Sequence, residues 1–202
     1  MPRIATDAGI AEFRNRLCTV GIELFAETGF DGFTMRQLAG RLGISAMTPY
    51  RYFKDKDAII SEMRGRAFQS FADWLEIHLT FPAADYTGLG QVCARYAIKE
   101  PSQYRLMFAL VQPVSLMSPL HVAQERRVRD IIAAHLRPLT NRNPLNGDPE
   151  RLNVVFWSVL HGAGALYMAG KLSDREFARA LCDAMTLFTG GSAEAVGESV
   201  NA

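Results

Sequence analysis

The chain has 202 residues, 49% of them hydrophobic, and a formal net charge of only +1. This length and apolar content predict a chain that folds around its own core. Cys18, Cys93 and Cys182 are odd in number and lie far apart, a pattern that suggests neither a disulfide framework nor a paired-cysteine zinc site and favours buried thiols in a reducing cytoplasm. The uncharged run 154–170 is at the short limit for a transmembrane helix and contains glycines, so we expect a buried helix and no membrane span.

Apolar residues recur at steps of three and four along nearly the whole chain, which predicts an all-α protein of about nine helices. A first helix ends at Gly29. Its apolar stripe consists of Ile10, Phe13, Leu17, Val20 and Leu24. Thr34 and Gln37 have the spacing of a capping box and start a second helix. Ser45 caps a third helix, which we expect over residues 46 to about 53.

A longer helix follows the cap residue Asp55. Its buried positions are expected to be Ile60, Met63, Ala67, Phe71, Trp74 and His78. Later helices are expected at roughly 85–99, 101–111, 119–137, 149–170 and 174–189. The expected organisation is a three-helix DNA-binding domain at 1–54, a helical bundle domain at 55–190 and a disordered tail at 191–202.

The segment TMRQLAGRLGISAMTPYRYF has the features of a helix-turn-helix. Gly43 permits a tight turn, and Ala39, four residues earlier, is small enough for two helices to cross closely. Apolar side chains that fix the angle between the helices are Leu38, Leu42 and Ile44. This arrangement predicts that the second helix of the pair lies in the major groove of DNA.

Positive charge is concentrated in the same segment, where Thr34 to Lys56 have a local net charge of +4. The basic residues are Arg36, Arg41, Arg51, Lys54 and Lys56, against the single acid Asp55. Side chains that donate hydrogen bonds to phosphates or base edges are Thr48, Tyr50, Arg51 and Tyr52. We therefore expect a phosphate-contacting surface here.

Residues from about 12 to 63, with ELFAETGFDGFTMRQLAGRLGIS followed by TPYRYFKDKDAII, resemble the DNA-binding domain of the TetR family of transcriptional regulators. That pattern has an LF-A-x-x-G-F/Y phrase, a G-V/I-S turn, and Y-x-Y/H-F before a lysine and an acid. The resemblance implies phosphate contacts by Thr34, Tyr52 and Lys56. It implies a position at the groove for Arg36, Ala46, Met47, Thr48, Tyr50 and Arg51. Ser45 completes the predicted DNA-binding set.

Two departures from the family pattern bear on base recognition. Pro49 stands where the family usually has leucine or isoleucine, and it lacks the amide hydrogen that a helix uses. Ala46 and Met47 stand where the family often has lysine and glycine, and both are suited to contact thymine methyl groups. The sequence leaves open which bases are read.

Two later phrases, YAIKEPSQYRLMF and FWSVLHGAGALYMAG, resemble a TetR subgroup with a P-x-x-Y/F-R-L-M-F phrase and a later W-x-x-x-H-G phrase. The matching residues are Pro101, Tyr104, Arg105, Leu106, Met107, Phe108, Trp157, His161 and Gly162.

The helix expected at 149–170 has apolar residues on every face, so a second surface must cover it. Small residues at 162–164 permit close helix approach, and we expect a four-helix homodimer interface across a two-fold axis. The predicted interface residues are Val159, Gly162, Ala163, Leu166, Phe177, Leu181, Ala184 and Phe188. The resemblance implies the same dimer, whose two recognition helices, about 34 Å apart, would enter successive major grooves of a palindromic site.

Bulky apolar side chains beyond the first domain are candidates for a pocket that accepts a small apolar or aromatic effector. They are Phe71, Trp74, Tyr96, Met107, Leu110, Val111, Met117, Phe156 and Leu160, with His121 as a hydrogen-bonding group. Ordinary core packing is the alternative for each of them, and His121 and His161 have the alternative of satisfied core histidines.

The sequence contains no Gly-rich phosphate loop, nucleophile phrase or His-x-x-x-His pair, so we expect no catalysis, no cofactor and no metal. Our hypothesis is a ligand-responsive repressor in which DNA and effector favour different separations of the two helix-turn-helix units. The alternative is a DNA-binding dimer whose C-terminal domain binds a protein partner or only dimerises. The sequence does not distinguish a repressor from an activator.

Overall fold

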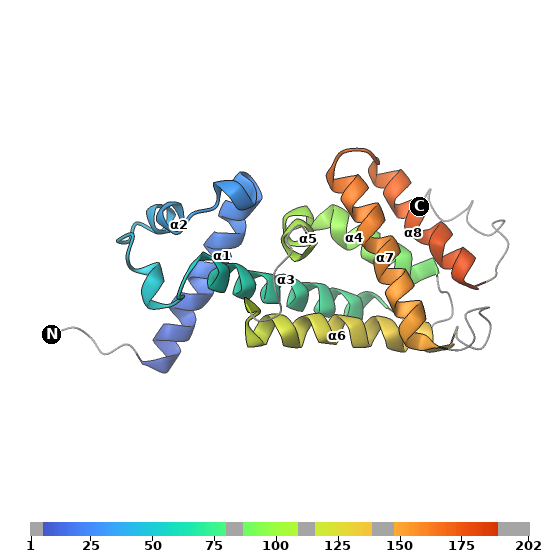
Figure 1. The fold of residues 1–202 in the computed structure, drawn as a ribbon, viewed down its shortest axis with the longest axis horizontal. Coiled ribbons are helices and arrows are strands. Elements are labelled where there is room, and N and C mark those ends of the chain that lie inside the picture. Colours follow the sequence, from blue (N-terminus) through green and yellow to red (C-terminus); the bar gives the residue numbers. More distant parts are fainter. Residues whose placement is uncertain (1–5, 80–86, 109–115, 139–147, 190–202) are drawn as a thin grey trace. The chain divides into compact units, whose positions relative to one another are not determined.

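The computed structural model describes residues 6–79, 87–108, 116–138 and 148–189 (Figure 1). Every regular element among these residues is helical, as predicted. The α-helices are α1 (Asp7–Gly32), α2 (Met35–Arg41), α3 (Lys56–His78), α4 (Thr87–Lys99), α5 (Pro101–Phe108), α6 (Pro119–Leu136), α7 (Pro149–Met168) and α8 (Asp174–Thr189). A 3₁₀ turn, η1, covers Pro49–Arg51.

The later helices begin and end within two residues of their predicted bounds, except that residues 109–111 lie outside the described part of the chain. The predicted tail at 191–202 also lies outside it. None of the described helices is long and apolar enough to cross a membrane.

The chain divides into two compact units. The first unit comprises residues 1–68 and 102–124, and so combines α1, α2, η1 and nearly all of α5 with the first parts of α3 and α6. The second unit comprises residues 69–101 and 125–202, with α4, α7 and α8 and the remaining parts of α3 and α6. The domain boundary expected after residue 54 stays a prediction.

Local signals set the helix ends in the first unit. Gly29 has a left-handed φ of 66° inside α1, so regular helix stops there, as predicted, and the chain turns toward α2. At the start of α2 the Gln37 amide donates to Thr34 Oγ1 at 3.2 Å, and the Thr34 hydroxyl donates to Gln37 Oε1 at 2.7 Å. The Ala58 amide donates to Asp55 Oδ1 at 2.8 Å, which confirms Asp55 as the cap of α3.

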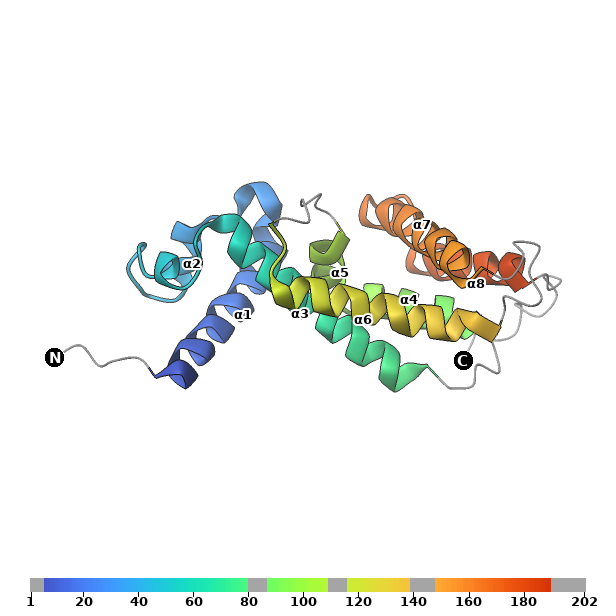
Figure 2. The same ribbon diagram turned by 60° about the horizontal axis from the view of Figure 1, so that its bottom comes forward.

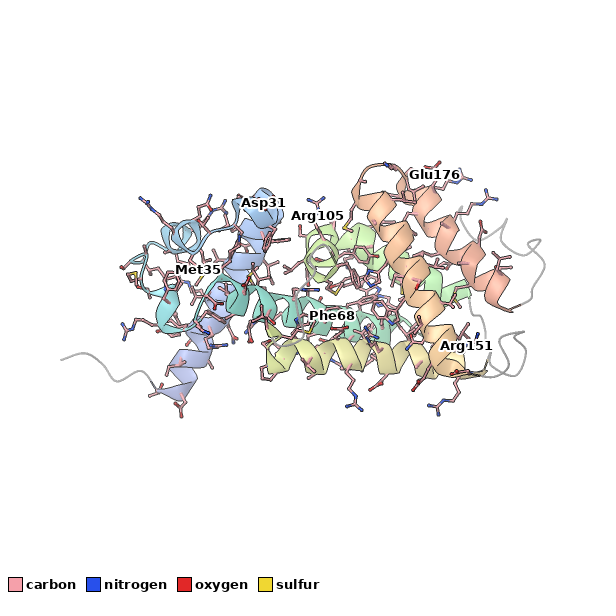
Figure 3. All side chains as sticks on the ribbon, viewed as in Figure 1. Asp31, Met35, Phe68, Arg105, Arg151 and Glu176 are labelled. Carbon is pink, nitrogen blue, oxygen red and sulfur yellow. The ribbon has the colours of Figure 1, made fainter. Side chains whose placement is uncertain are left out.

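Within the first unit, α3 and α6 pack closely around a buried histidine. His121 is fully buried, its Nδ1 lies 3.2 Å from Ser61 Oγ, and its ring stacks on Phe68 at 5.5 Å. Phe68 is labelled on α3 in Figure 3. A Cβ atom added to Gly65 of α3 would lie 2.7 Å from the backbone nitrogen of His121, so only glycine permits this approach. His121 is therefore a hydrogen-bonded core residue, and its role in a ligand pocket stays a prediction.

In the second unit, α8 packs on both α4 and α7, and Figure 2 shows α7 and α8 running beside each other. A Cβ added to Gly90 of α4 would lie 2.7 Å from the Leu181 carbonyl oxygen, so α4 and α8 are in close contact. The start of α8 has the predicted capping box: the Glu176 amide donates to Ser173 Oγ at 3.3 Å, and the Ser173 amide donates to Glu176 Oε2 at 2.9 Å.

The Gly65 contact yields a stability prediction. Gly65→Ala forces the backbones of α3 and α6 apart, so we expect the free energy of unfolding to fall by about 1–3 kcal/mol in urea denaturation. The matched control is Gly40→Ala in α2, where an added Cβ meets nothing within 4 Å. Because alanine has a greater helix propensity than glycine, we expect this variant to keep or raise the free energy of unfolding. Equal stability of the two variants would contradict the close packing described.

Candidate nucleic-acid interface

A tight turn joins α2 to the segment that follows it. Gly43 has φ 64°, a left-handed conformation that glycine adopts without strain. The Ile44 amide donates to the Ala39 carbonyl at 3.0 Å, and Leu38 and Ala39 are fully buried. The small residue, turn glycine and apolar contacts predicted for a helix-turn-helix therefore lie together.

We call residues Ser45–Phe53 the recognition segment; the prediction that an α-helix covers most of it is wrong. The only helical element in the segment is η1, in which the Arg51 and Tyr52 amides donate to the Thr48 and Pro49 carbonyls at 3.1 and 3.0 Å. A turn precedes it, in which the Thr48 amide donates to the Ser45 carbonyl at 2.8 Å. The reason is Pro49, which is buried and has no amide hydrogen to continue a helical ladder from Ser45. Ser45 therefore caps no α-helix. Its side-chain Oγ accepts one long hydrogen bond, from the Met47 amide at 3.4 Å.

None of the ten predicted DNA-binding residues is buried. The exposed ones are Thr34, Arg36, Ser45, Ala46, Met47, Tyr50 and Arg51, and the half-buried ones are Thr48, Tyr52 and Lys56. Met47 is 68% exposed and Tyr50 46% exposed, so both side chains have surface available for a partner. The turn at Pro49 thus presents the recognition segment to solvent.

Some positive charges of the predicted patch are engaged in contacts within the chain, and others are exposed to solvent. Arg41 forms a bidentate ion pair with Glu27, and this hydrogen bonding lowers the pKa of the Glu27 carboxyl. Lys56 Nζ donates to the Phe30 carbonyl at 2.7 Å and lies 4.2 Å from the centre of the Phe30 ring, so α3 is tied to the end of α1. Arg36, Arg51 and Lys54 are exposed, and they form the accessible cationic face.

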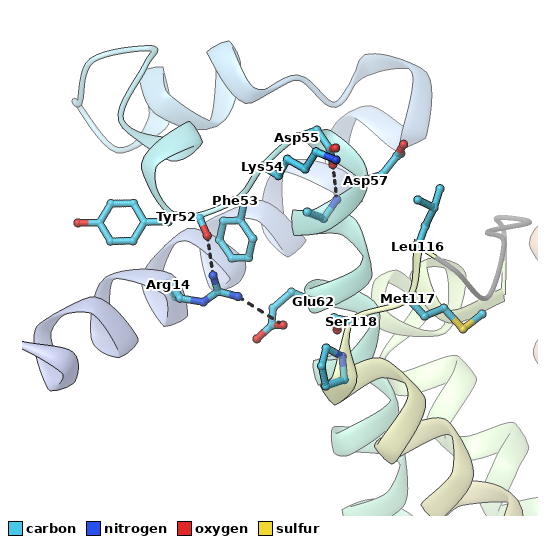
Figure 4. Close-up of a pocket in the computed structure, with 12 residues that line it drawn as sticks. Arg14, Tyr52, Phe53, Lys54, Asp55, Asp57, Glu62, Leu116, Met117 and Ser118 are labelled. Atoms are coloured by element: carbon cyan, nitrogen blue, oxygen red, sulfur yellow. Dashed lines mark hydrogen bonds and ion pairs between the residues drawn. The ribbon is translucent and has the colours of Figure 1, made fainter.

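A cavity of about 380 Å³ lies beside the recognition segment, within the first unit (Figure 4). It is lined by Arg14, Tyr52, Phe53, Lys54, Asp55, Asp57, Ala58, Glu62, Leu116, Met117, Ser118 and Pro119. The Arg14 guanidinium donates to the Tyr52 carbonyl at 2.5 Å. Sequence reasoning missed Arg14, because no local pattern pairs residues 38 positions apart.

Two family profiles match the chain. Residues 17–63 match bacterial regulatory proteins of the tetR family, and residues 87–187 match the tetracyclin repressor-like C-terminal domain. The chain belongs to the TetR family. Members of this family are DNA-binding transcriptional regulators, and the helix-turn-helix lies inside the first match.

Solved structures have the same fold as this TetR-family chain. A protein with unknown function from Rhodococcus sp. RHA1 has a TM-score of 0.70 at 19% identity, covering 94% of this chain and 97% of its own. A TetR-family transcriptional regulator from Pectobacterium atrosepticum has a TM-score of 0.69 at 19% identity, covering 92% and 96%. The TetR family transcriptional regulator PfmR from Thermus thermophilus has a TM-score of 0.61 at 23% identity, covering 84% and 96%. No curated protein matches the sequence.

The residues predicted for a TetR-type dimer interface lie on different faces of α7 and α8. Gly162 and Leu166 are exposed on α7, with Leu166 at 45%, while Val159, Ala163 and Ala184 are half-buried. Phe177 and Leu181 are fully buried within the chain itself, so they have no surface left for a partner. The side chain of Phe188 lies outside the described part.

The residues predicted for a ligand pocket are mostly buried. Phe71, Trp74 and Tyr96 form an aromatic cluster in the second unit, with ring centres 4.7 Å apart for Phe71 and Tyr96 and 5.9 Å apart for Trp74 and Tyr96. Burial raises the pKa of the Tyr96 hydroxyl, which therefore stays protonated. Phe156 and Leu160 of the second unit and Met107 and His121 of the first are fully buried, and Met117 lines the cavity of Figure 4. Leu110 and Val111 lie outside the described residues.

The W-x-x-x-H-G phrase forms a surface feature of the second unit. The rings of Trp157 and His161 lie 5.4 Å apart, and the Arg129 guanidinium lies 5.6 Å from the centre of the Trp157 ring. These residues line a cavity of about 340 Å³ together with Asn153, Val154 and Ser158. Partial burial and the charge of Arg129 lower the pKa of His161, so the imidazole is neutral near pH 7.

Other reactive groups lie in the interior. Burial raises the pKa of the Cys18 thiol to about 11 and also raises that of Cys93, so neither is a reactive thiolate at neutral pH. Among the described residues, no group of three His, Cys, Asp or Glu side chains is placed to hold a metal ion.

Proposed function

We propose that this TetR-family protein is a cytoplasmic, ligand-responsive repressor that binds a palindromic operator as a homodimer. The observation that carries the DNA-binding part is the recognition segment, which lies directly after the Gly43 turn and is largely exposed. It contains the exposed cation Arg51, and the exposed cations Arg36 and Lys54 lie before and after it in the sequence. Exposed cations on a helix-turn-helix are suited to DNA phosphates, whose neutralisation dominates affinity.

Roles within the interface follow from side-chain chemistry. Arg51 and Tyr50 have hydrogen-bond donors for phosphates or base edges, whereas Met47 has only an apolar surface. In the major groove the apolar partner available to Met47 is the thymine methyl group. We therefore propose that Met47 reads thymine, and that Thr34, Tyr52 and Lys56 contact phosphates.

DNA binding is testable with a fluorescent duplex taken from immediately upstream of the coding sequence, titrated at several salt concentrations. Arg51→Gln removes a phosphate-contacting charge, so we expect affinity to fall about tenfold and the dependence of log affinity on log salt to become shallower. The control Arg126→Gln removes the same charge from α6, where the side chain is 82% exposed and only weakly paired with Asp130. The proposal would be contradicted if Arg51→Gln and Arg126→Gln lowered the affinity for the duplex equally. It would also be contradicted if the wild-type protein bound the upstream duplex as weakly as a scrambled one.

The homodimer is supported by large apolar side chains that are exposed on α7 and α8. The proposed face includes Val154, 62% exposed, Gly162 and Leu166, and the nearby helix α8 adds Leu187, 79% exposed. Large apolar side chains that remain exposed along one helix favour a helix from another protein chain as their cover. A two-fold axis through this face would pair α7 and α8 with the same helices of a second copy.

A single charge at this face tests the dimer. We expect Leu166→Asp to convert the protein to a monomer in analytical ultracentrifugation, because an aspartate buried in an apolar interface lacks a partner for its charge. The control is Ile77→Asp on α3, a site that is more exposed, at 76%, and is not part of the proposed interface. A Leu166→Asp protein that remains dimeric would exclude this face.

The effector is proposed to be a small apolar or aromatic molecule. Support comes from the aromatic cluster of Phe71, Trp74 and Tyr96, because such rings line most pockets for apolar ligands. The single helix α3 contains Lys56 at its start and Phe71 and Trp74 further along, so a shift of α3 would couple effector binding to DNA binding. A compound that binds the protein while operator affinity stays unchanged would contradict this coupling.

A further inference from the structure

The side chain of Arg14 in α1 makes three contacts with the elements that surround the recognition segment (Figure 4). Its Nη1 donates to the Tyr52 carbonyl at 2.5 Å, and its Nη2 lies 3.7 Å from Glu62 Oε2 on α3. Its guanidinium carbon lies 4.2 Å from the centre of the Phe53 ring. One planar cation thus contacts the last two residues of the recognition segment and the helix that follows it.

Among the described residues, the backbone provides no donor for the Tyr52 carbonyl, and the Arg14 guanidinium is the donor that it has. The last amide bonded back into η1 is that of Phe53, which donates to the Pro49 carbonyl at 3.0 Å. Among the described backbone hydrogen bonds, none reaches the Tyr52 carbonyl, since α3 begins only at Lys56. A charge-assisted bond from a guanidinium replaces the helical bond that the chain lacks here.

The orientation of Arg14 is set by a largely buried carboxylate. The Glu62 side chain is 14% exposed and lies near two guanidinium groups, those of Arg14 and Arg66, at 3.7 Å each. Arg66 also donates to Asn15 Oδ1 at 2.6 Å and is positioned on α3 one turn after Glu62. Arg66 therefore shares the carboxylate with Arg14 but makes no described contact with the recognition segment.

We propose that Arg14 is a positioning residue, which holds the recognition segment in its DNA-binding conformation through the Tyr52 carbonyl. The effect of Arg14 on operator affinity rests on the proposed function. Its effect on the mobility of the recognition segment in the free protein does not. Without Arg14, the backbone bonds of η1, the burial of Pro49 and the contact of the Phe13 and Tyr52 rings remain. The Tyr52 carbonyl then has no donor, so the position from which the Tyr52 hydroxyl is proposed to reach phosphate becomes less fixed.

The first test is hydrogen exchange of the free, full-length protein. We expect Arg14→Gln to speed exchange of the Arg51, Tyr52 and Phe53 amides about tenfold, because a charge-assisted bond is lost. Exchange in α2 should stay unchanged, which separates local loosening from general destabilisation. The matched control Arg66→Gln removes an equal charge from the same carboxylate and should leave the recognition segment at the wild-type rate.

The second test is a double-mutant cycle in operator binding with Tyr52→Phe, which keeps the Tyr52 carbonyl and removes only the hydroxyl. We expect Arg14→Gln to weaken operator binding about tenfold in the wild-type background and clearly less in the Tyr52→Phe background, because both changes remove the same contact. If Arg14 itself contacted phosphate, the two losses would add and the salt dependence would become shallower in both backgrounds.

The outcomes distinguish a failure of the positioning role of Arg14 from a failure of the proposed DNA-binding function. Unchanged exchange at Arg51–Phe53 in Arg14→Gln, or additive losses in the cycle, would overturn the positioning role. A wild-type protein that binds no duplex specifically would overturn the proposed function instead, while the exchange measurement would still decide whether Arg14 holds the segment.

Discussion

The amide hydrogen that Pro49 lacks determines how this DNA-binding unit is built. A recognition helix normally holds its own shape through backbone bonds, but here that ladder is interrupted after Ser45 and leaves one 3₁₀ turn. The segment must therefore be held from outside. Burial of Pro49, the contact of the Phe13 and Tyr52 rings at 4.7 Å and the guanidinium of Arg14 provide that support.

The same constraint makes α1 one of the elements that contact and hold the recognition segment. Phe13 and Arg14 are neighbours in α1 and both contact Tyr52, one through its ring and one through its carbonyl. Lys56 ties the start of α3 to the end of α1 through the Phe30 carbonyl. The helices α1 and α3, which lie before and after the recognition segment in the sequence, therefore hold it together.

Features that depend on a few neighbouring residues were predictable from the sequence. Gly29, the Thr34 and Asp55 caps and the Ser173 capping box follow from local hydrogen bonds and backbone conformation, and all are confirmed. The prediction of a third helix over residues 46 to about 53 is wrong. The sequence pattern and the family resemblance favoured a helix there, but Pro49 lacks the amide hydrogen that the helix needs. The contact between Arg14 and Tyr52 depends on tertiary packing and leaves no trace in local spacing.

Periodicity also does not reveal which partner covers an apolar face. Phe177 and Leu181 belong to an apolar stripe of α8, and the sequence alone assigned them to a second copy of the chain. In the structure both are buried within one chain, where the absence of a side chain at Gly90 lets α4 approach α8. Leu166 and Leu187 are large apolar residues that remain exposed on α7 and α8.

The most direct test of the recognition segment is methyl NMR of protein labelled at methionine, with and without the upstream duplex. Met47 is 68% exposed in the segment, whereas Met63 is fully buried in α3 and reports on the core. A specific complex should shift the Met47 methyl resonance strongly and leave that of Met63 nearly unchanged. A Met47 resonance that does not move at saturating duplex would show that DNA, if bound, contacts another surface.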